Sequence, residues 1–262
     1  MCCSRHYTFY SILMRPFFYI ICILLSTLLF SACEAKPNYQ QVKWVYDGDT
    51  LLLKDGRKIR IIGINTPEVA HHKKKGERYG REATEQLRAL LKQSNNRVRL
   101  ELGKEKLDRY KRHLAHVFLP DGRDISLWML KNGWATTMIF PPNTHYIDNY
   151  QQAEHTAQKK KLNIWRQKNH QIMTSSQLKK SYTGYVRLKA RIKKIKLRKK
   201  SVILQLDKKI LIKLGKRYIK YFNTYDPKKL LHKNIIISGI LRKHRGKRTI
   251  TLRHPAQLDI LN

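Results

Sequence analysis

Oxygen-donating groups flank a predicted β-hairpin near residue 50. Asp49 follows a glycine turn, and Asn65 and Thr66 come directly after the apolar run Ile59–Ile64. The Asp49 carboxylate, the Asn65 amide and the Thr66 backbone carbonyl are hard oxygen ligands, which calcium and magnesium prefer. The pattern therefore favours a cation site at the ends of two strands. Acidic residues also flank hairpins in many β proteins without a chemical role, so the turn alone leaves both interpretations open.

A carboxylate and an arginine accompany these ligands. Glu68 follows Pro67, whose ring stiffens the backbone, so Glu68 can be held in place as a general base. Arg60 carries a planar guanidinium whose forked donors match a phosphate. Hydrolysis of a phosphodiester needs an activated water, stabilised charge on the phosphoryl oxygens and in-line geometry. These residue types would suit that chemistry.

The order of these residues resembles the thermonuclease family, whose best-known member is staphylococcal nuclease. The resemblance extends over residues 41–165, and the spacing between segments is consistent throughout. The matching segments are Asp47-Gly48-Asp49-Thr50, Arg60, Thr66-Pro67-Glu68, Asp108–Ala115, Pro142-Asn143 and Lys161–Trp165. So many segments in the same order are difficult to attribute to chance.

The resemblance implies a phosphodiesterase: a calcium-dependent endonuclease that hydrolyses DNA and RNA without preference for the sugar and leaves 3′-phosphate products. The implied Ca²⁺ ligands are Asp49, Asn65 and Thr66. The implied catalytic residues are Glu68 as general base, with Arg60 and Arg112 stabilising the phosphorane-like transition state.

Three further residues are candidates for contact with the nucleic acid. Arg109 and Tyr110 could contact a terminal phosphate or sugar, although Arg109 fits a solvated surface charge equally well. Phe140 could stack on a base, because stacking needs only an aromatic face. These interactions carry no sequence readout.

The chain departs from the family pattern at three places. Asn65 replaces an aspartate, which keeps an oxygen ligand but removes a unit of charge. Lys111 and His113 stand beside the second arginine, where the family usually has glycine. Met138 and Phe140 replace two nucleotide-stacking tyrosines. A second hypothesis is therefore a weak or inactive nuclease-like module that binds extracellular nucleic acid or another polyanion.

Apolar periodicity predicts a mainly β fold with helices, of the α+β class. Val42, Trp44 and Tyr46 alternate with polar residues, which is typical of a half-buried strand. Further predicted strands and helices are the hairpin with its turn at Asp55-Gly56, strands at 98–102 and 114–119, and helices at 80–92, from Asp124 through Leu130, and around 146–157. The resemblance implies a five-stranded OB-fold barrel with three helices.

Residues 1–35 are typical of a signal peptide, with arginines before a short apolar run at 17–30. The run ends in Phe30-Ser31-Ala32-Cys33, which resembles a lipobox in which Cys33 is lipidated. Ordinary cleavage, for example after Ala35, and an uncleaved anchor are the alternatives. We therefore expect an exported protein, either a periplasmic or cell-envelope lipoprotein attached to a membrane through Cys33 or a secreted enzyme.

Composition divides the remaining chain in two. We expect a nuclease-like domain at 36–168, a linker at 169–181 and a basic OB-like domain at 182–262. From Gln171 to Asn262, 26 lysines and arginines stand against three acidic residues. This excess favours sequence-nonspecific binding of DNA and RNA, with an anionic lipid surface or a generally basic protein as alternatives. No protein partner is implied.

Overall fold

The computed structural model describes residues 38–70, 75–206, 210–222, 226–244 and 246–261. The chain divides into two units, Met1–Asn38 and Tyr39–Asn262. The predicted signal peptide and Cys33 lie outside the described residues. Within the described part of the chain, no helix has both the length and the apolar character needed to cross a membrane.

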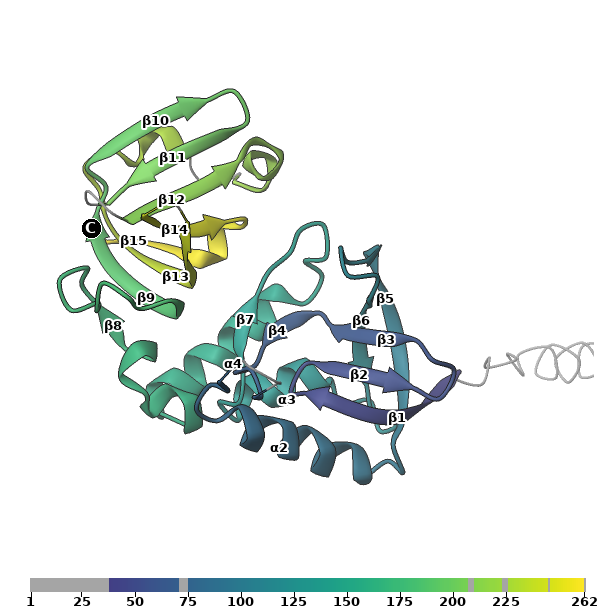
Figure 1. Cartoon of the computed structure of the whole chain (residues 1–262). Helices are drawn as coiled ribbons and strands as arrows, with labels where there is room; N and C mark the ends of the chain where they lie inside the picture. The colour runs from purple at the N-terminus through teal and green to yellow at the C-terminus, as the bar shows by residue number, and fades with distance from the viewer. Residues whose placement is uncertain (1–37, 71–74, 207–209, 223–225, 245, 262) are drawn as a thin grey trace, which may run out of the picture. The chain divides into compact units, whose positions relative to one another are not determined.

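The first half of the second unit is a closed five-stranded barrel (Figure 1). Its strands follow each other in the order β1-β2-β3-β6-β5, and β5 pairs with β1 to close the barrel. β3 and β6 are parallel, and the other neighbours are antiparallel. The strands are β1 Tyr39–Asp47, β2 Thr50–Leu53, β3 Lys58–Ile61, β5 Arg97–Leu107 and β6 His113–Phe118.

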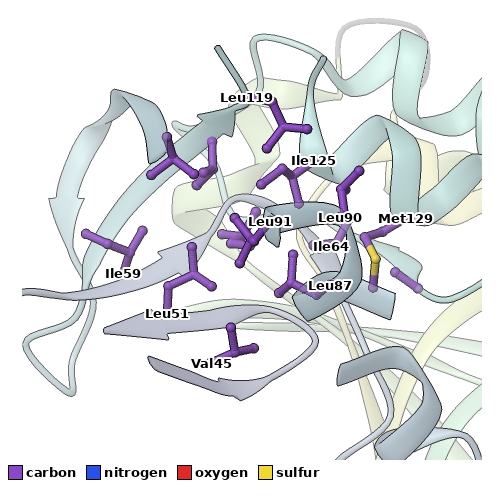
Figure 2. Packing of buried hydrophobic residues seen from close by; sticks show 14 of the residues in the cluster. Val45, Leu51, Ile59, Ile64, Leu87, Leu90, Leu91, Leu119, Ile125 and Met129 are labelled. Atoms are coloured by element: carbon purple, nitrogen blue, oxygen red, sulfur yellow. The ribbon is translucent and has the colours of Figure 1, made fainter. Parts of the chain in front are cut away.

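Three helices and a small sheet cover this barrel. They are α2 Gly80–Lys92, α3 Ile125–Lys131, α4 Ile147–Lys159 and the antiparallel pair β4 Gly63–Asn65 and β7 Thr136–Met138. α2 has the predicted bounds, and its apolar residues are buried at helical spacing. Leu87, Leu90 and Leu91 join Val45 and Leu51 of the barrel in one core (Figure 2). Helix and barrel therefore share a single hydrophobic interior.

One detail of the first strand differs from the predicted alternation. Trp44 is 55% exposed, while Val42 and Val45 are buried. The pairing of β1 with β2 shifts register between Val42 and Trp44, as in a β-bulge. A bulge adds a residue to one strand, so the side chains after it change faces. The prediction that Trp44 belongs to the same face as Val42 was wrong for this reason.

The second half contains an additional β domain, an eight-stranded sheet in the order β10-β11-β12-β14-β13-β9-β8, with β15 on β13. Its elements are β8 Ile172–Met173, β9 Gly184–Arg191, β10 Lys194–Arg198, β11 Ser201–Gln205, β12 Ile210–Gly215, η3 Lys216–Tyr221, η4 Pro227–Leu230, β13 Asn234–His244, β14 Lys247–Leu252, η5 Pro255–Gln257 and β15 Leu258–Leu261.

The second sheet repeats the order of the first barrel. β12 and β14 are parallel, as β3 and β6 are, and β13 lies between β14 and β9. Only Ile192 and Lys193 separate β9 from β10, so one bent segment pairs with β13 at one end and with β11 at the other. This segment thereby joins the two ends of the strand order from β11 to β13.

Residues 169–181, predicted as a linker, are packed onto the second domain. β8 pairs in parallel with β9, and Met173 and Leu178 are buried in the second core. Just before them are two short 3₁₀ turns, η1 Asn163–Arg166 and η2 Lys168–His170. Trp165 packs edge-on against Tyr185 of β9, with ring centroids 6.1 Å apart. The segment therefore contributes a strand and buried side chains to the second domain.

Candidate functional site

The turn between β1 and β2 places Asp49 against Thr66. The Asp49 backbone N–H donates to Asp47 Oδ1 at 3.0 Å, and the Thr66 N–H donates to Asp49 Oδ2 at 3.0 Å. Asp49 is buried. A Cβ at position 48 would lie 2.6 Å from Thr66 Cγ2, so only glycine permits this approach. The turn after β1 and the residue after β4 thus meet at one buried carboxylate.

Arg60 forms a buried ion pair with Asp49. Its Nη2 lies 3.1 Å from Asp49 Oδ2, and the two side chains are 13% and 8% exposed. Arg60 also donates to the carbonyl oxygens of Ile61 and Ile64. Because these acceptors fix the guanidinium, its positive charge stays beside the Asp49 carboxylate.

Arg112 reaches the same carboxylate from the start of β6 through Thr50. Its Nη1 donates to Thr50 Oγ1 at 3.1 Å, and the Thr50 hydroxyl donates to Asp49 Oδ1 at 3.1 Å. Asp108 orients Arg112 by accepting from its backbone N–H and its Nε at 2.9 and 2.8 Å. Burial acts to raise the pKa of Asp108, but the hydrogen bonds from Arg112 and Tyr110 outweigh it and hold the pKa below its usual value.

Asn65 stands at the end of β4 with its amide turned to the backbone. Its Nδ2 donates to the Thr66 carbonyl oxygen at 3.2 Å, and its own backbone carbonyl accepts from Thr136 Oγ1. A carboxylate could not donate this bond. The Asn65 amide therefore hydrogen-bonds the Thr66 carbonyl oxygen, which was predicted as a cation ligand.

Glu68 is exposed, and its backbone is fixed by Glu77. The Glu77 N–H donates to the Glu68 carbonyl at 2.8 Å, and the Glu68 N–H donates to Glu77 Oε2 at 3.2 Å. A Cβ at Gly80 would lie 2.4 Å from the Glu68 carbonyl oxygen, so glycine lets this loop lie against the start of α2. Asn65 and Glu68 both line a cavity of about 400 Å³.

Two acids of the turn lie close enough to influence each other. Burial, followed by the charge of Asp49, raises the pKa of Asp47 to about 7. A cation beside these carboxylates would relieve that cost, and the available donors are oxygens, as calcium requires. The described residues contain no group of three or more His, Cys, Asp or Glu side chains placed to hold a metal. Neutral oxygens of Thr66 and Asn65 would have to complete the ligand set, which fits a hard cation.

The residues predicted to contact nucleic acid lie in two places. Tyr110, 65% exposed, lies beside Arg109 and Arg112, whose guanidinium carbons are 4.6 and 5.6 Å from its ring centroid. Phe140 lies on the loop after β7 and is 44% exposed. Asn143 fixes this loop by exchanging two 3.0 Å hydrogen bonds with the backbone of Glu105.

The structure thus brings Asp49, Arg60, Thr66 and Arg112 into one hydrogen-bonded group, with Asn65 attached through Thr66. Sequence reasoning missed three supporting residues: Thr50, Glu77 and Asp108. Thr50 and Asp108 were inside the segments that carried the resemblance. Asp108 could have been found, because an acidic residue four positions before Arg112 can pair with it. No sequence signal pointed to Glu77.

Comparison with known proteins agrees with this geometry. Residues 58–167 match the family model described as "Staphylococcal nuclease homologue". The thermonuclease of Staphylococcus intermedius is 38% identical over 138 residues, which cover 52% of this chain and 80% of the relative. That of Staphylococcus hyicus is 39% identical over 136 residues, covering 50% and 78%. Endonuclease YncB of Bacillus subtilis is 33% identical over 124 residues, covering 45% and 57%. The chain therefore belongs to the staphylococcal nuclease family.

Proposed function

We propose that the chain is an exported nuclease, calcium-dependent and sugar-nonspecific, that hydrolyses DNA and RNA to 3′-phosphate products. Membership of a family whose relatives are thermonucleases and an endonuclease supports the nuclease activity itself. One observation carries the assignment of the site. The two oxygens of the buried Asp49 are linked to Arg60 directly and to Arg112 through Thr50.

The two arginines would bind and orient the scissile phosphate. They approach from different strands, β3 and the start of β6, and both are held by protein acceptors before substrate arrives. Preorganised donors stabilise developing charge without reorganising during the reaction. Arg60 and Arg112 would therefore stabilise the negative charge that grows on the phosphoryl oxygens.

Glu68 would take the proton from the attacking water. Its exposed side chain stands on a backbone fixed by Glu77, so the carboxylate can reach solvent while its anchor point stays in place. Asp49, the Thr66 carbonyl and the Asn65 amide oxygen would hold Ca²⁺. Bound there, the ion supplies Lewis-acid stabilisation of a phosphate oxygen.

Glu68→Gln tests this mechanism. We expect initial rates on single-stranded DNA to fall about 10²- to 10⁴-fold, because glutamine cannot accept the proton. Binding, measured by fluorescence anisotropy, should stay close to that of the parent protein. Glu82→Gln, at an exposed position in the first turn of α2, is the charge-matched control. Unchanged hydrolysis in Glu68→Gln would refute the role of Glu68.

A second candidate function, a weak or inactive module that binds polyanions, is favoured by Asn65. Its amide already satisfies the Thr66 carbonyl, and it contributes no charge to a cation. The same assay separates the two functions. An inactive module would bind single-stranded DNA but show no hydrolysis at millimolar calcium and no response to chelator.

We propose export because residues 1–35 are typical of a signal peptide. We also propose that residues 182–262 bind nucleic acid. Mass spectrometry of the mature amino terminus would distinguish a lipidated Cys33, with membrane attachment, from ordinary cleavage and secretion.

A further inference from the structure

An arginine of the second domain lies on the aromatic ring predicted to stack on a base. The Arg253 guanidinium carbon is 4.5 Å from the centroid of the Phe140 ring. Arg253 follows β14, whereas Phe140 follows β7 of the first domain. Phe140 still exposes 44% of its surface. Arg253 therefore contacts the ring while much of the Phe140 surface stays exposed.

Arg253 and Arg217 both interact with the side chain of Tyr218, and Arg242 adds a third positive charge nearby. Arg217 donates to Tyr218 Oη at 2.8 Å, and its guanidinium carbon is 4.8 Å from the Tyr218 ring centroid. Arg253 also interacts with the Tyr218 side chain, while burial and the charges of Arg242 and Arg217 lower its pKa. None of the ion pairs found among the described residues includes these three arginines. These arginines thus carry uncompensated positive charge.

Arg242 connects the second domain with the loop that carries the predicted general base. Arg242 lines the same cavity of about 400 Å³ as Asn65 and Glu68. It also lies close enough to Arg253 to lower its pKa. One positively charged side chain of the second domain therefore lines the cavity that Glu68 also lines.

Other contacts also join the two domains. Gln151 of α4 donates to the carbonyl of Ala256, three residues after Arg253, at 3.2 Å. Tyr185 of β9 is buried, stacked on His170 and packed edge-on against Trp165. These contacts between the domains help to hold Arg253 beside Phe140.

We propose that Phe140, Arg217, Arg242 and Arg253 form one subsite, shared by both domains, for the part of a single-stranded nucleic acid that extends beyond the scissile phosphate. This proposal rests on the proposed nuclease function, and it identifies where the rest of the substrate strand would bind. A base would stack on the free surface of Phe140, and the arginines would contact the adjoining phosphates. Stacking on an isolated ring needs an unpaired base, which selects single strands over duplex.

The test is equilibrium binding of a fluorescent oligothymidylate, measured by anisotropy in chelator so that no turnover occurs. Arg253→Met and Arg217→Met remove the charge and keep an apolar stem. Arg198→Met is the matched control. Arg198 is an exposed arginine on β10, three strands from β14 in the sheet order. We expect Arg253→Met and Arg217→Met to weaken binding about fivefold more than the control, with a smaller salt slope.

Phe140→Leu should weaken binding on the order of tenfold, and Phe140→Trp should restore it. Because Arg253 and Phe140 are in contact, Arg253→Met combined with Phe140→Leu should weaken binding by less than the two single effects combined. If Arg253→Met does not fold, the exposed Arg217 decides the outcome. Effects no greater than that of Arg198→Met would overturn the proposal.

This outcome is separate from that of the proposed function. A protein without hydrolysis can still show the arginine-dependent binding, which would refute the nuclease mechanism alone. A protein that hydrolyses DNA while Arg217→Met and Arg253→Met bind as the control does would refute the subsite alone.

Discussion

The two domains have the same strand order and opposite charges at the same turn. Between the first two strands of the barrel, the turn carries the buried Asp49, whereas the corresponding turn between β10 and β11 carries the exposed Lys199 and Lys200. A buried carboxylate needs partners, and Asp49 has three: Thr50, Arg60 and Thr66. Exposed lysines need none. The shared frame therefore accommodates either a buried carboxylate or exposed positive charges at this turn.

The largest effect should come from removing the charge of the acidic turn. Asp49→Asn would leave Arg60 buried without its counter-ion, which costs about 3–5 kcal/mol. Hydrolysis should fall as well, because a predicted cation ligand is weakened. Urea unfolding measures the stability, and initial rates measure the activity.

The control for that experiment is Asp55→Asn. Asp55 pairs with Arg57, but these side chains are 42% and 34% exposed, so the destabilisation should stay below about 1 kcal/mol. Equal destabilisation in both variants would show that burial of the Asp49 pair has no special consequence.

A smaller effect should follow from adding an acidic group at the end of β4, next to Thr66. Asn65→Asp restores the family's charge and removes the amide that donates to Thr66. We expect the calcium concentration for half-maximal hydrolysis to fall about tenfold, because ligand charge tunes calcium affinity. A calcium titration of initial rates measures it. No shift would mean that residue 65 is not a ligand.

The smallest effect should come from neutralising the basic turn. Lys199→Gln with Lys200→Gln should reduce the salt slope of single-stranded DNA binding by about 0.7 for each phosphate that these lysines neutralise. Stability should barely change, because both side chains are exposed. Lys92→Gln, at an exposed position in the last turn of α2, is the control. An unaltered salt slope would show that these lysines do not contact the nucleic acid.

Much of the first domain could be predicted because its signals are local. The apolar spacing of α2 and the Asp124 cap, which accepts from the Leu127 N–H, appear in the structure as expected. Trp44 was misplaced because a bulge has no sequence signature in that strand. Lys111 was noted as a departure from glycine, and it adopts a left-handed φ of +62° that glycine would adopt without strain.

The site was only partly predictable. Residue type and spacing indicated Asp49 and Arg60, and the resemblance added Arg112. The Thr50 hydroxyl that joins Arg112 to Asp49 depends on how separate strands meet, which local sequence does not show. Glu77 was missed because its partner lies nine residues back in an irregular loop. The contact of Arg253 with Phe140 joins two domains, and no periodicity or spacing encodes such a contact.

Gly48 has a consequence for anyone who wishes to make this enzyme more heat-resistant. Replacing glycine by alanine is a common way to stiffen a loop, and it succeeds where alanine can adopt the existing backbone angles without a clash. The backbone at Gly48 is not left-handed, so a survey of dihedral angles would select it for such a change. The methyl group would instead push Thr66 away from Asp49. A Gly48→Ala substitution chosen from backbone angles alone would thus damage the proposed cation site.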